Sequence, residues 1–205
     1  MTDYTFVRWV LDTVNQTDGV TTLAFNIDDD STAVAVYEIV LRTVTIQTTP
    51  LTGAAVGGTP SGTSNYVATV NDNSEVNLVA PATLADGDVD YELVRWSLNG
   101  VDQPVSQLNA TFDIQEDTTA IATYQIIPRT LTVQSTPATG LTILGLPAGT
   151  TNYAEDVDDN SVVNLTAPAM VNHAGTDYGF AVWRVDGIDM PANPVSYTHL
   201  TLPTN

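Results

Sequence analysis

Apolar and polar residues alternate with a period of two over several short stretches of this chain. In the stretch 42–48, Val44 and Ile46 alternate with threonine and glutamine, and the stretch 74–78 places Val76 and Leu78 in the same way. This alternation is typical of a β-strand with one buried face. The stretches 33–38 and 119–125 are rich in β-branched and aromatic residues, which also favour strands. No window has a sustained helical period, so the pattern predicts an all-β protein.

The segments between these strands carry turn chemistry. They contain Thr-Pro, Gly-Gly, Asn-Asp-Asn and Ala-Asp-Gly-Asp, in which each residue type favours tight turns for its own conformational reason. About seven short strands at turn-punctuated spacing predict a small sandwich-like domain.

The chain repeats itself with a period of 87 residues and without a gap. Tryptophan recurs at three positions with this spacing, and many further residues recur twice. The identities are Tyr4, Tyr91 and Tyr178; Trp9, Trp96 and Trp183; Phe25 and Phe112; Ile27 and Ile114; Tyr37 and Tyr124; Arg42 and Arg129; Pro60 and Pro147; Gly62 and Gly149; Tyr66 and Tyr153; Asp72 and Asp159. The spacing exceeds the usual repeat of solenoid proteins and is long enough for a small domain with its own core.

The period divides the chain into copies. We expect residues 1–40 to be the C-terminal half of one copy, 41–127 a complete second copy, and 128–194 a truncated third copy. Only 41–127 is then expected to fold independently, because the incomplete copies leave unpaired sheet edges. The predicted fold is therefore a row of small β-sandwich-like modules, of immunoglobulin-like or B-repeat type.

Residues 195–205 break the repeat. The second copy continues beyond Gln103-Pro-Val-Ser106 toward a closing strand, whereas the third copy continues beyond Asn193-Pro-Val-Ser196 with unrelated residues. Back-translated, these residues resemble a transposase-type sequencing adapter. We expect this tail to be a non-native addition to a gene fragment.

Charge narrows the range of partners. The chain has 24 acidic residues, 19 of them aspartate, against five arginines and no lysine, which gives a net charge of −19. Such a charge repels phosphates, so nucleic acid and anionic membranes are not expected partners. No apolar run approaches the length of a membrane span, so membrane insertion is not expected. Cysteine is absent, so neither disulfides nor cysteine-based zinc sites contribute.

The stacked copies resemble the divergent internalin-type B-repeat, which occurs in tandem in large bacterial and archaeal surface proteins. The resemblance covers nearly all of residues 1–196. It is carried by the strand from Tyr91 to Trp96 that leads into Asn99-Gly100, and by the closing strand Asp117-Thr-Thr-Ala-Ile-Ala-Thr-Tyr124. It implies an extracellular or cell-surface, adhesin-like protein without catalytic residues, in which neighbouring repeats of the same chain are the partners.

Each tryptophan lies on the same strand face as apolar neighbours, which is how a core residue is placed. We therefore expect Trp9, Trp96 and Trp183, together with Tyr37 and Tyr124, to form structural cores. Stacking of an exposed tryptophan on a glycan is the alternative.

Aspartate clusters offer the oxygen ligands that calcium prefers. We expect a calcium ion, if one binds, at Asp72, Asp156, Asp158 and Asp159. The repeat gives an internal control, because most acidic residues of these clusters do not recur after 87 residues. Solvated turn residues are therefore the favoured interpretation.

Catalysis has little support in the sequence. The one histidine outside the tail, His173, has no counterpart in the second copy, and no Ser/His/Asp set recurs. We expect a non-catalytic spacer or stalk segment of a surface protein. A glycan- or protein-binding module that uses its inter-strand loops is the alternative.

Overall fold

A computed structural model describes residues 1–190, all of it strands and connections without a helix. The tail 195–205 and the last residues of the third copy lie outside this range. The described chain forms two compact units. The first comprises Met1–Leu84 and Glu92–Gln125, and the second comprises Ala85–Tyr91 and the described residues from Ile126. The first copy therefore belongs to the same unit as most of the second copy.

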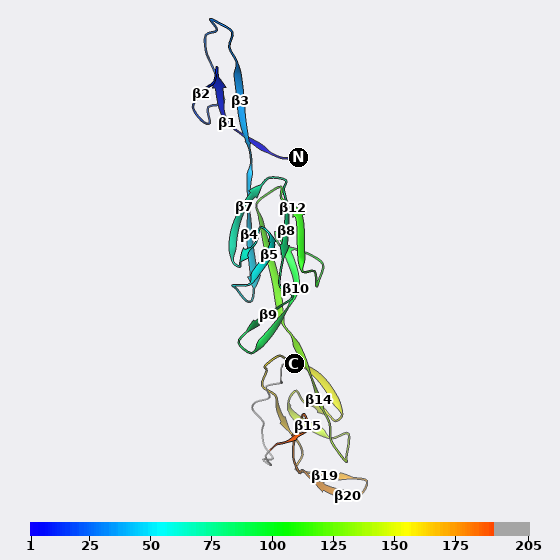
Figure 1. Ribbon diagram of the computed structural model, residues 1–205. Coiled ribbons are helices and arrows are strands. Elements are labelled where there is room, and N and C mark those ends of the chain that lie inside the picture. The colour runs from blue at the N-terminus through cyan, green and yellow to red at the C-terminus, as the bar shows by residue number, and fades with distance from the viewer. Residues whose placement is uncertain (191–205) are drawn as a thin grey trace. The chain divides into compact units, whose positions relative to one another are not determined.

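The second copy forms two sheets. One has the order β11-β10-β13-β4-β7, with β9 paired to β10, and the other has the order β12-β8-β5-β6. Figure 1 shows these strands curled into a half-barrel. Their bounds are β4 Leu41–Thr49, β5 Ala55–Thr59, β6 Gly62–Thr63, β7 Tyr66–Asn71, β8 Glu75–Val79, β9 Thr83–Asp86, β10 Val89–Leu98, β11 Val101–Asp102, β12 Asn109–Asp113 and β13 Thr118–Ile126.

Apolar alternation explains the core of the second copy. The largest fully buried side chains are those of Trp96, Ile46, Leu78, Ile114, Val44 and Val76. Five of them come from strands of both sheets, and Ile114 directly follows β12. On β4 and β8 they are the alternating residues of each strand. Burial of such side chains contributes roughly 1.5–3 kcal/mol each, so these few positions dominate the stability of the unit.

One strand pair of this region is parallel. Strand β13 runs parallel to β4, with Thr118 opposite Val44 and Thr123 opposite Thr49. On its other side β4 pairs antiparallel with β7, from Leu41 opposite Asn71 to Ile46 opposite Tyr66. The first and the last strand of the second copy thus lie side by side.

The first copy forms a three-stranded sheet of order β2-β1-β3, from strands β1 Tyr4–Leu11, β2 Val14–Asn15 and β3 Ala33–Ile39. The pairing of β1 with β3 is interrupted by a bulge between Phe6 and Arg8. Residue Val40 alone separates β3 from β4.

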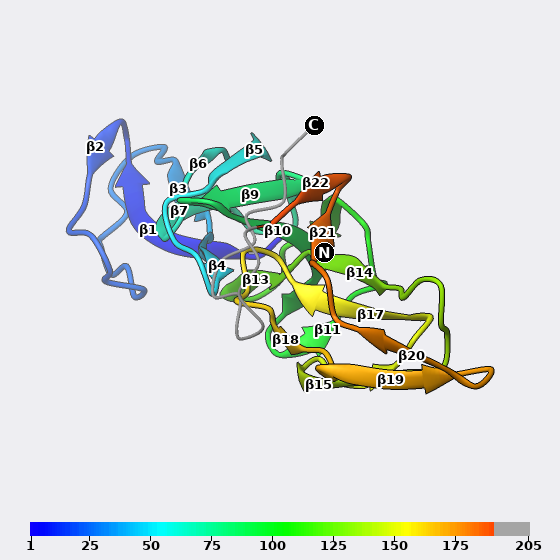
Figure 2. The same ribbon diagram turned by 90° about the horizontal axis from the view of Figure 1, so that it is seen from below.

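The second unit contains several small sheets. Strand β14 pairs with β17, and β15 pairs with both β16 and β18; Figure 2 shows β14 beside β17. Two hairpins, β19–β20 and β21–β22, complete the described part. The bounds are β14 Pro128–Val133, β15 Thr142–Leu146, β16 Gly149–Thr150, β17 Tyr153–Asp158, β18 Asn164–Thr166, β19 Met170–His173, β20 Thr176–Gly179, β21 Arg184–Val185 and β22 Ile188–Asp189.

Among residues 1–190, none forms a helix with the length and apolarity that crossing a bilayer requires.

Candidate functional site

Arg42 ties two aspartates together in the first unit. Arg42 lies on β4, Asp72 follows the end of β7, and Asp3 precedes β1. The Nε of Arg42 donates to Oδ1 of Asp72 at 2.6 Å, and its Nη2 donates to Oδ2 of Asp3 at 2.8 Å. The backbone N–H of Asp3 donates to Oδ2 of Asp72 at 2.7 Å. Both oxygens of the buried Asp72 carboxylate are therefore engaged.

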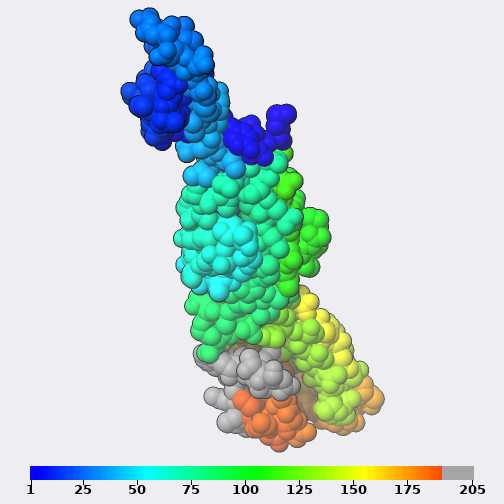
Figure 3. Space-filling model, turned by 45° about the horizontal axis from the view of Figure 1, so that its top comes forward, coloured from blue at the N-terminus to red at the C-terminus, as the bar shows by residue number. Residues whose placement is uncertain are grey.

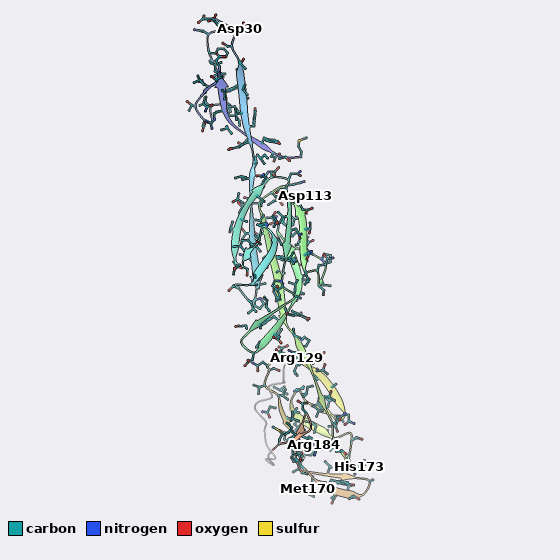
Figure 4. All side chains as sticks on the ribbon, viewed as in Figure 1. Asp30, Asp113, Arg129, Met170, His173 and Arg184 are labelled. Atoms are coloured by element: carbon teal, nitrogen blue, oxygen red, sulfur yellow. The ribbon has the colours of Figure 1, made fainter. Side chains whose placement is uncertain are left out.

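The same three hydrogen bonds occur 87 residues later, in the second unit. The Nε of Arg129 donates to Oδ1 of Asp159 at 2.8 Å, and its Nη2 donates to Oδ2 of Asp90 at 2.8 Å. The backbone N–H of Asp90 donates to Oδ2 of Asp159 at 2.8 Å. Arg129 is labelled in Figure 4. We call the two sets the bridges: Arg42 with Asp3 and Asp72, and Arg129 with Asp90 and Asp159.

At each bridge, the single residue that connects two consecutive strands is also hydrogen-bonded. The N–H of Val40 donates to the carbonyl of Asp3 at 2.9 Å, and the carbonyl of Val40 accepts the N–H of Asp72 at 2.8 Å. In the second unit the N–H of Ile127 donates to the carbonyl of Asp90 at 2.9 Å, and its carbonyl accepts the N–H of Asp159 at 3.2 Å. Both the N–H and the carbonyl of each one-residue connection are thus hydrogen-bonded.

Hydrogen bonds to the ionised carboxylate lower the pKa of Asp72 and of Asp159. For Asp72 the main cause is the backbone N–H of Asp3, followed by the guanidinium of Arg42. For Asp159 the main cause is the guanidinium of Arg129, followed by the backbone N–H of Asp90. Stabilisation of the charged form by such donors is the usual origin of a depressed carboxyl pKa. The two aspartates act as structural anions.

The four aspartates proposed as calcium ligands are placed as follows. Asp72 and Asp159 accept from arginine in the bridges, and Asp156 accepts from the Oγ1 of Thr130 at 2.8 Å. Asp158 is exposed at the end of β17. Within residues 1–190, no three acidic or histidine side chains are grouped as a metal site requires. The calcium hypothesis stays a prediction.

Of the predicted core aromatics, Trp96 and Tyr124 are the most deeply buried. Trp96 is 0% exposed and Tyr124 is 4% exposed. The indole Nε1 of Trp96 donates to the carbonyl of Leu108 at 3.0 Å, and the hydroxyl of Tyr124 donates to the carbonyl of Pro81 at 2.8 Å. Burial raises the pKa of Tyr124 to about 12. The polar end of each ring therefore has a partner, as buried tryptophan and tyrosine require.

The expectation of a core position is wrong for Tyr37, which is 56% exposed. Trp9 and Trp183 are only partly buried. The physical reason is visible for Trp9 and Tyr37. Both lie in the single three-stranded sheet of the first copy, which has no second sheet of its own to pack against. Instead, Phe6 contacts Trp9 and Tyr37, with ring centroids 6.0 Å and 5.6 Å apart.

All five arginines pair with aspartates. Outside the bridges the pairs are Arg8 with Asp18, Arg95 with Asp102, and Arg184 with Asp189. These pairs are more exposed, so each adds little to stability. His173 is exposed at the end of β19, where Figure 4 labels it.

A small cavity lies in the second unit, next to one bridge. Its volume is about 20 Å³, and it is lined by Arg129, Leu131, Val157, Asp158, Asn160, Ser161 and Val163. A space of this size holds about one water molecule, far below the 300–1,000 Å³ of small-molecule sites.

Sequence reasoning named Asp72 and Asp159 as possible calcium ligands, with solvated turn residues as the favoured interpretation, and it missed Asp3 and Asp90 as their partners. The signal was available. Arg42, Asp72 and Asp3 all recur after 87 residues, whereas most other acidic residues do not. Joint recurrence of a cation and two anions indicates an ion-pair network.

Comparison with protein-family profiles, curated proteins and solved structures gives no match for this chain.

Proposed function

We propose that the chain is a run of tandem, sandwich-like β modules with a period of 87 residues. It serves as a non-catalytic spacer or stalk segment of a large extracellular or cell-surface protein. The resemblance to divergent internalin-type B-repeats supports the same function.

The bridges are the observation that carries this proposal. Each bridge joins an aspartate of one copy to an arginine and an aspartate of the next copy. The connection between copies is one residue long and hydrogen-bonded on both sides, at Val40 and again at Ile127. A stalk needs junctions that resist bending, and a short bonded connection supplies such resistance, whereas a long Gly/Ser linker would not.

Surface chemistry fits a spacer as well. The net charge of −19 makes neighbouring chains repel one another within a Debye length, about 8–10 Å in physiological salt. Trp96, the residue of the second copy best suited to stack on a sugar, is fully buried. The glycan-binding alternative therefore loses its strongest candidate residue in this copy.

The junction is tested by distance measurements within the first unit. Spin labels are attached at Val14→Cys and Val67→Cys, two exposed positions on either side of Val40. We expect a narrow distance distribution that broadens with Arg42→Gln. The control Arg95→Gln breaks an exposed ion pair away from the junction and should leave the width unchanged. A distribution that is equally broad in all three proteins would contradict an ordered junction.

Autonomy of the module is tested with residues 41–127 alone. We expect cooperative unfolding by urea and a Trp96 emission that is shielded from acrylamide. A fragment that is unfolded in buffer would refute the modular arrangement.

A further inference from the structure

Strand β7 forms an open edge of its sheet. Within residues 1–190, β4 is the one strand that pairs with β7, which lies along one side of the half-barrel in Figure 1. Figure 3 shows the residues around β7, in cyan and teal, at the surface of the first unit. Val67 is 63% exposed, and Thr69 and Asn71 are exposed as well. An edge strand of this kind can pair with a strand of another chain.

The ladder with β4 leaves backbone groups of β7 available. The N–H of Asp72 donates to the carbonyl of Val40, so in the register of this ladder every second residue counted back from Asp72 bonds to β4. Val67 and Thr69 are the residues in between. Their N–H and C=O groups therefore point away from β4, toward the open side of the sheet.

The other edges of the second copy carry features that discourage pairing. Strands β6 and β11 are two residues long, and Asp86, Asp102 and Asp113 lie on β9, β11 and β12. Short strands and charged side chains are the usual protection of a sheet edge. Strand β7 has six residues, Tyr-Val-Ala-Thr-Val-Asn, and none of them is charged. It is thus a long edge without this protection.

The counterpart of β7 in the third copy is charged. Strand β17 pairs with β14 in the register that β7 has with β4, so Thr130 lies opposite Asp156 as Thr43 lies opposite Thr69. Glu155, Asp156 and Asp158 all lie on β17, whereas β7 has alanine, threonine and asparagine at these positions. The fold therefore accepts acidic residues on this strand, and their absence from β7 is a property of the second copy.

We propose that β7 pairs antiparallel with β7 of a second copy of this chain. Val67 of each chain then lies opposite Thr69 of the other, and the twofold axis passes through the pair of Ala68 residues. This register uses the outward N–H and C=O groups of Val67 and Thr69 in both chains. It also places alanine on the axis, at a non-hydrogen-bonded pair where the two Cα atoms come closest.

Charge favours a second β7 as the partner strand. On the outer face beside the edge, β4 carries Thr43, Thr45 and Gln47, which are uncharged like β7 itself. Two chains of net charge −19 therefore meet here without acidic residues on the paired strands. Strands β9, β11 and β12 would each bring an aspartate to the contact, and removing its charge from water is costly.

The pairing reverses one chain relative to the other. The chain enters β4 at Leu41 and leaves β13 at Ile126, at opposite ends of the parallel pair of strands. The twofold axis inverts this direction in the second chain. Chains that project from two facing surfaces run in opposite directions, so the contact suits adhesion between such surfaces. This reading of the contact rests on the proposed function, whereas the strand pairing itself does not.

Cysteine crosslinking of the full chain tests the register, because the protein has no cysteine of its own. One protein carries Val67→Cys and the other carries Thr69→Cys, and the two are mixed under mild oxidation. Directly opposite residues of antiparallel strands lie within disulfide range, whereas two copies of the same cysteine lie two positions out of register. We expect mixed dimers to predominate over dimers of either protein alone. A mixture of Val67→Cys with Val101→Cys, an exposed position of β11, is the control and should show no such excess.

The role of charge is tested by sedimentation equilibrium of the full chain without cysteine. Thr69→Asp gives β7 the residue that β17 has at this position, and each dimer then carries the charge twice. We expect the association constant to fall about tenfold, since like charges close to one another across paired strands repel. Thr69→Val should retain association, and so should Val101→Asp, which adds the same charge at an exposed site outside β7. Higher salt should strengthen association, because it screens the repulsion between the two acidic chains.

Three results would overturn the proposal: a chain that stays monomeric up to about 1 mM, no excess of mixed disulfides over the control, or equal association of Thr69→Asp and Val101→Asp. Failure here is distinct from failure of the proposed function. If residues 41–127 fold alone while the full chain stays monomeric, the module stands and only the pairing of β7 is wrong.

Discussion

Gly58 is a position at which a single added methyl group should be strongly destabilising. Its φ of +93° lies in a region that residues with a Cβ rarely adopt. A Cβ added there would lie 1.9 Å from the carbonyl oxygen of Asn77 on β8. Real non-bonded contacts do not reach this distance, so β5 and β8 would have to separate. Gly58→Ala therefore disrupts the pairing that runs from Gly57 opposite Val79 to Thr59 opposite Asn77.

Substitutions at two nearby glycines separate the backbone strain from the steric collision. Gly53 has a φ of +82° with nothing within 4 Å of an added Cβ, so Gly53→Ala carries only the backbone strain, about 1–2 kcal/mol. Gly57 has no such φ, and its added Cβ would meet Val79 at an ordinary 3.7 Å. Gly57→Ala is therefore expected within about 1 kcal/mol of wild type. Gly58→Ala adds the collision to the strain and should cost about 3 kcal/mol or more.

Urea unfolding measures the three variants. Trp96 serves as the probe in a background of Trp9→Phe and Trp183→Phe, so that the emission reports the core of the second copy alone. The expected order of midpoints is Gly57→Ala above Gly53→Ala above Gly58→Ala. If Gly58→Ala were no less stable than Gly53→Ala, the close approach of β5 to β8 would be refuted.

Three further outcomes are expected. Burial raises the pKa of Tyr124 from 10.0 to about 12, so the unfolded chain loses the phenol proton at lower pH than the folded chain. The free energy of unfolding should therefore fall as pH rises through that interval. Tyr124→Phe should reduce the corresponding fall in the urea midpoint. The lowered pKa of Asp72 makes its contribution complete above the ordinary value of 3.8 and lost as pH falls below it, so Asp72→Asn should reduce the acid sensitivity measured by circular dichroism. Millimolar calcium should leave the melting temperature of the chain unchanged in calorimetry, since Asp72 and Asp159 already bind arginine; a rise would contradict that reading of the bridges.

The strands could be predicted from local patterns, but their partners could not. The stretches 42–48 and 119–125 lie within β4 and β13, because alternation and β-branched residues are local properties. Nothing local indicates that these two strands pair in parallel, since pairing depends on the course of the whole chain. The two-residue strands β6 and β11 were also beyond prediction, because so short a segment has no period.

Residue type alone also predicted the burial and the role of a side chain less well than its place in the fold does. Trp96 and Tyr37 both lie in mostly apolar strands, yet Trp96 is buried and Tyr37 is 56% exposed. Burial depends on whether a second sheet is present: the second copy has two sheets, whereas the first copy has one. For the aspartates, charge suggested either a solvated turn or a metal ligand, and the ion pairs of Asp72 with Arg42 and of Asp159 with Arg129 could not be predicted from charge alone.

The parallel pairing of β4 with β13 has a mechanical consequence. The chain enters β4 at Leu41 and leaves β13 at Ile126, and because the strands run in the same direction, these points lie at opposite ends of the pair. A pulling force applied to the two ends loads the registered pairs from Thr118–Val44 to Thr123–Thr49 together, in shear. A hairpin pulled from its open end would instead unzip one bond at a time. Under tension along the chain, these hydrogen bonds therefore resist together rather than one after another, which gives them their greatest mechanical resistance.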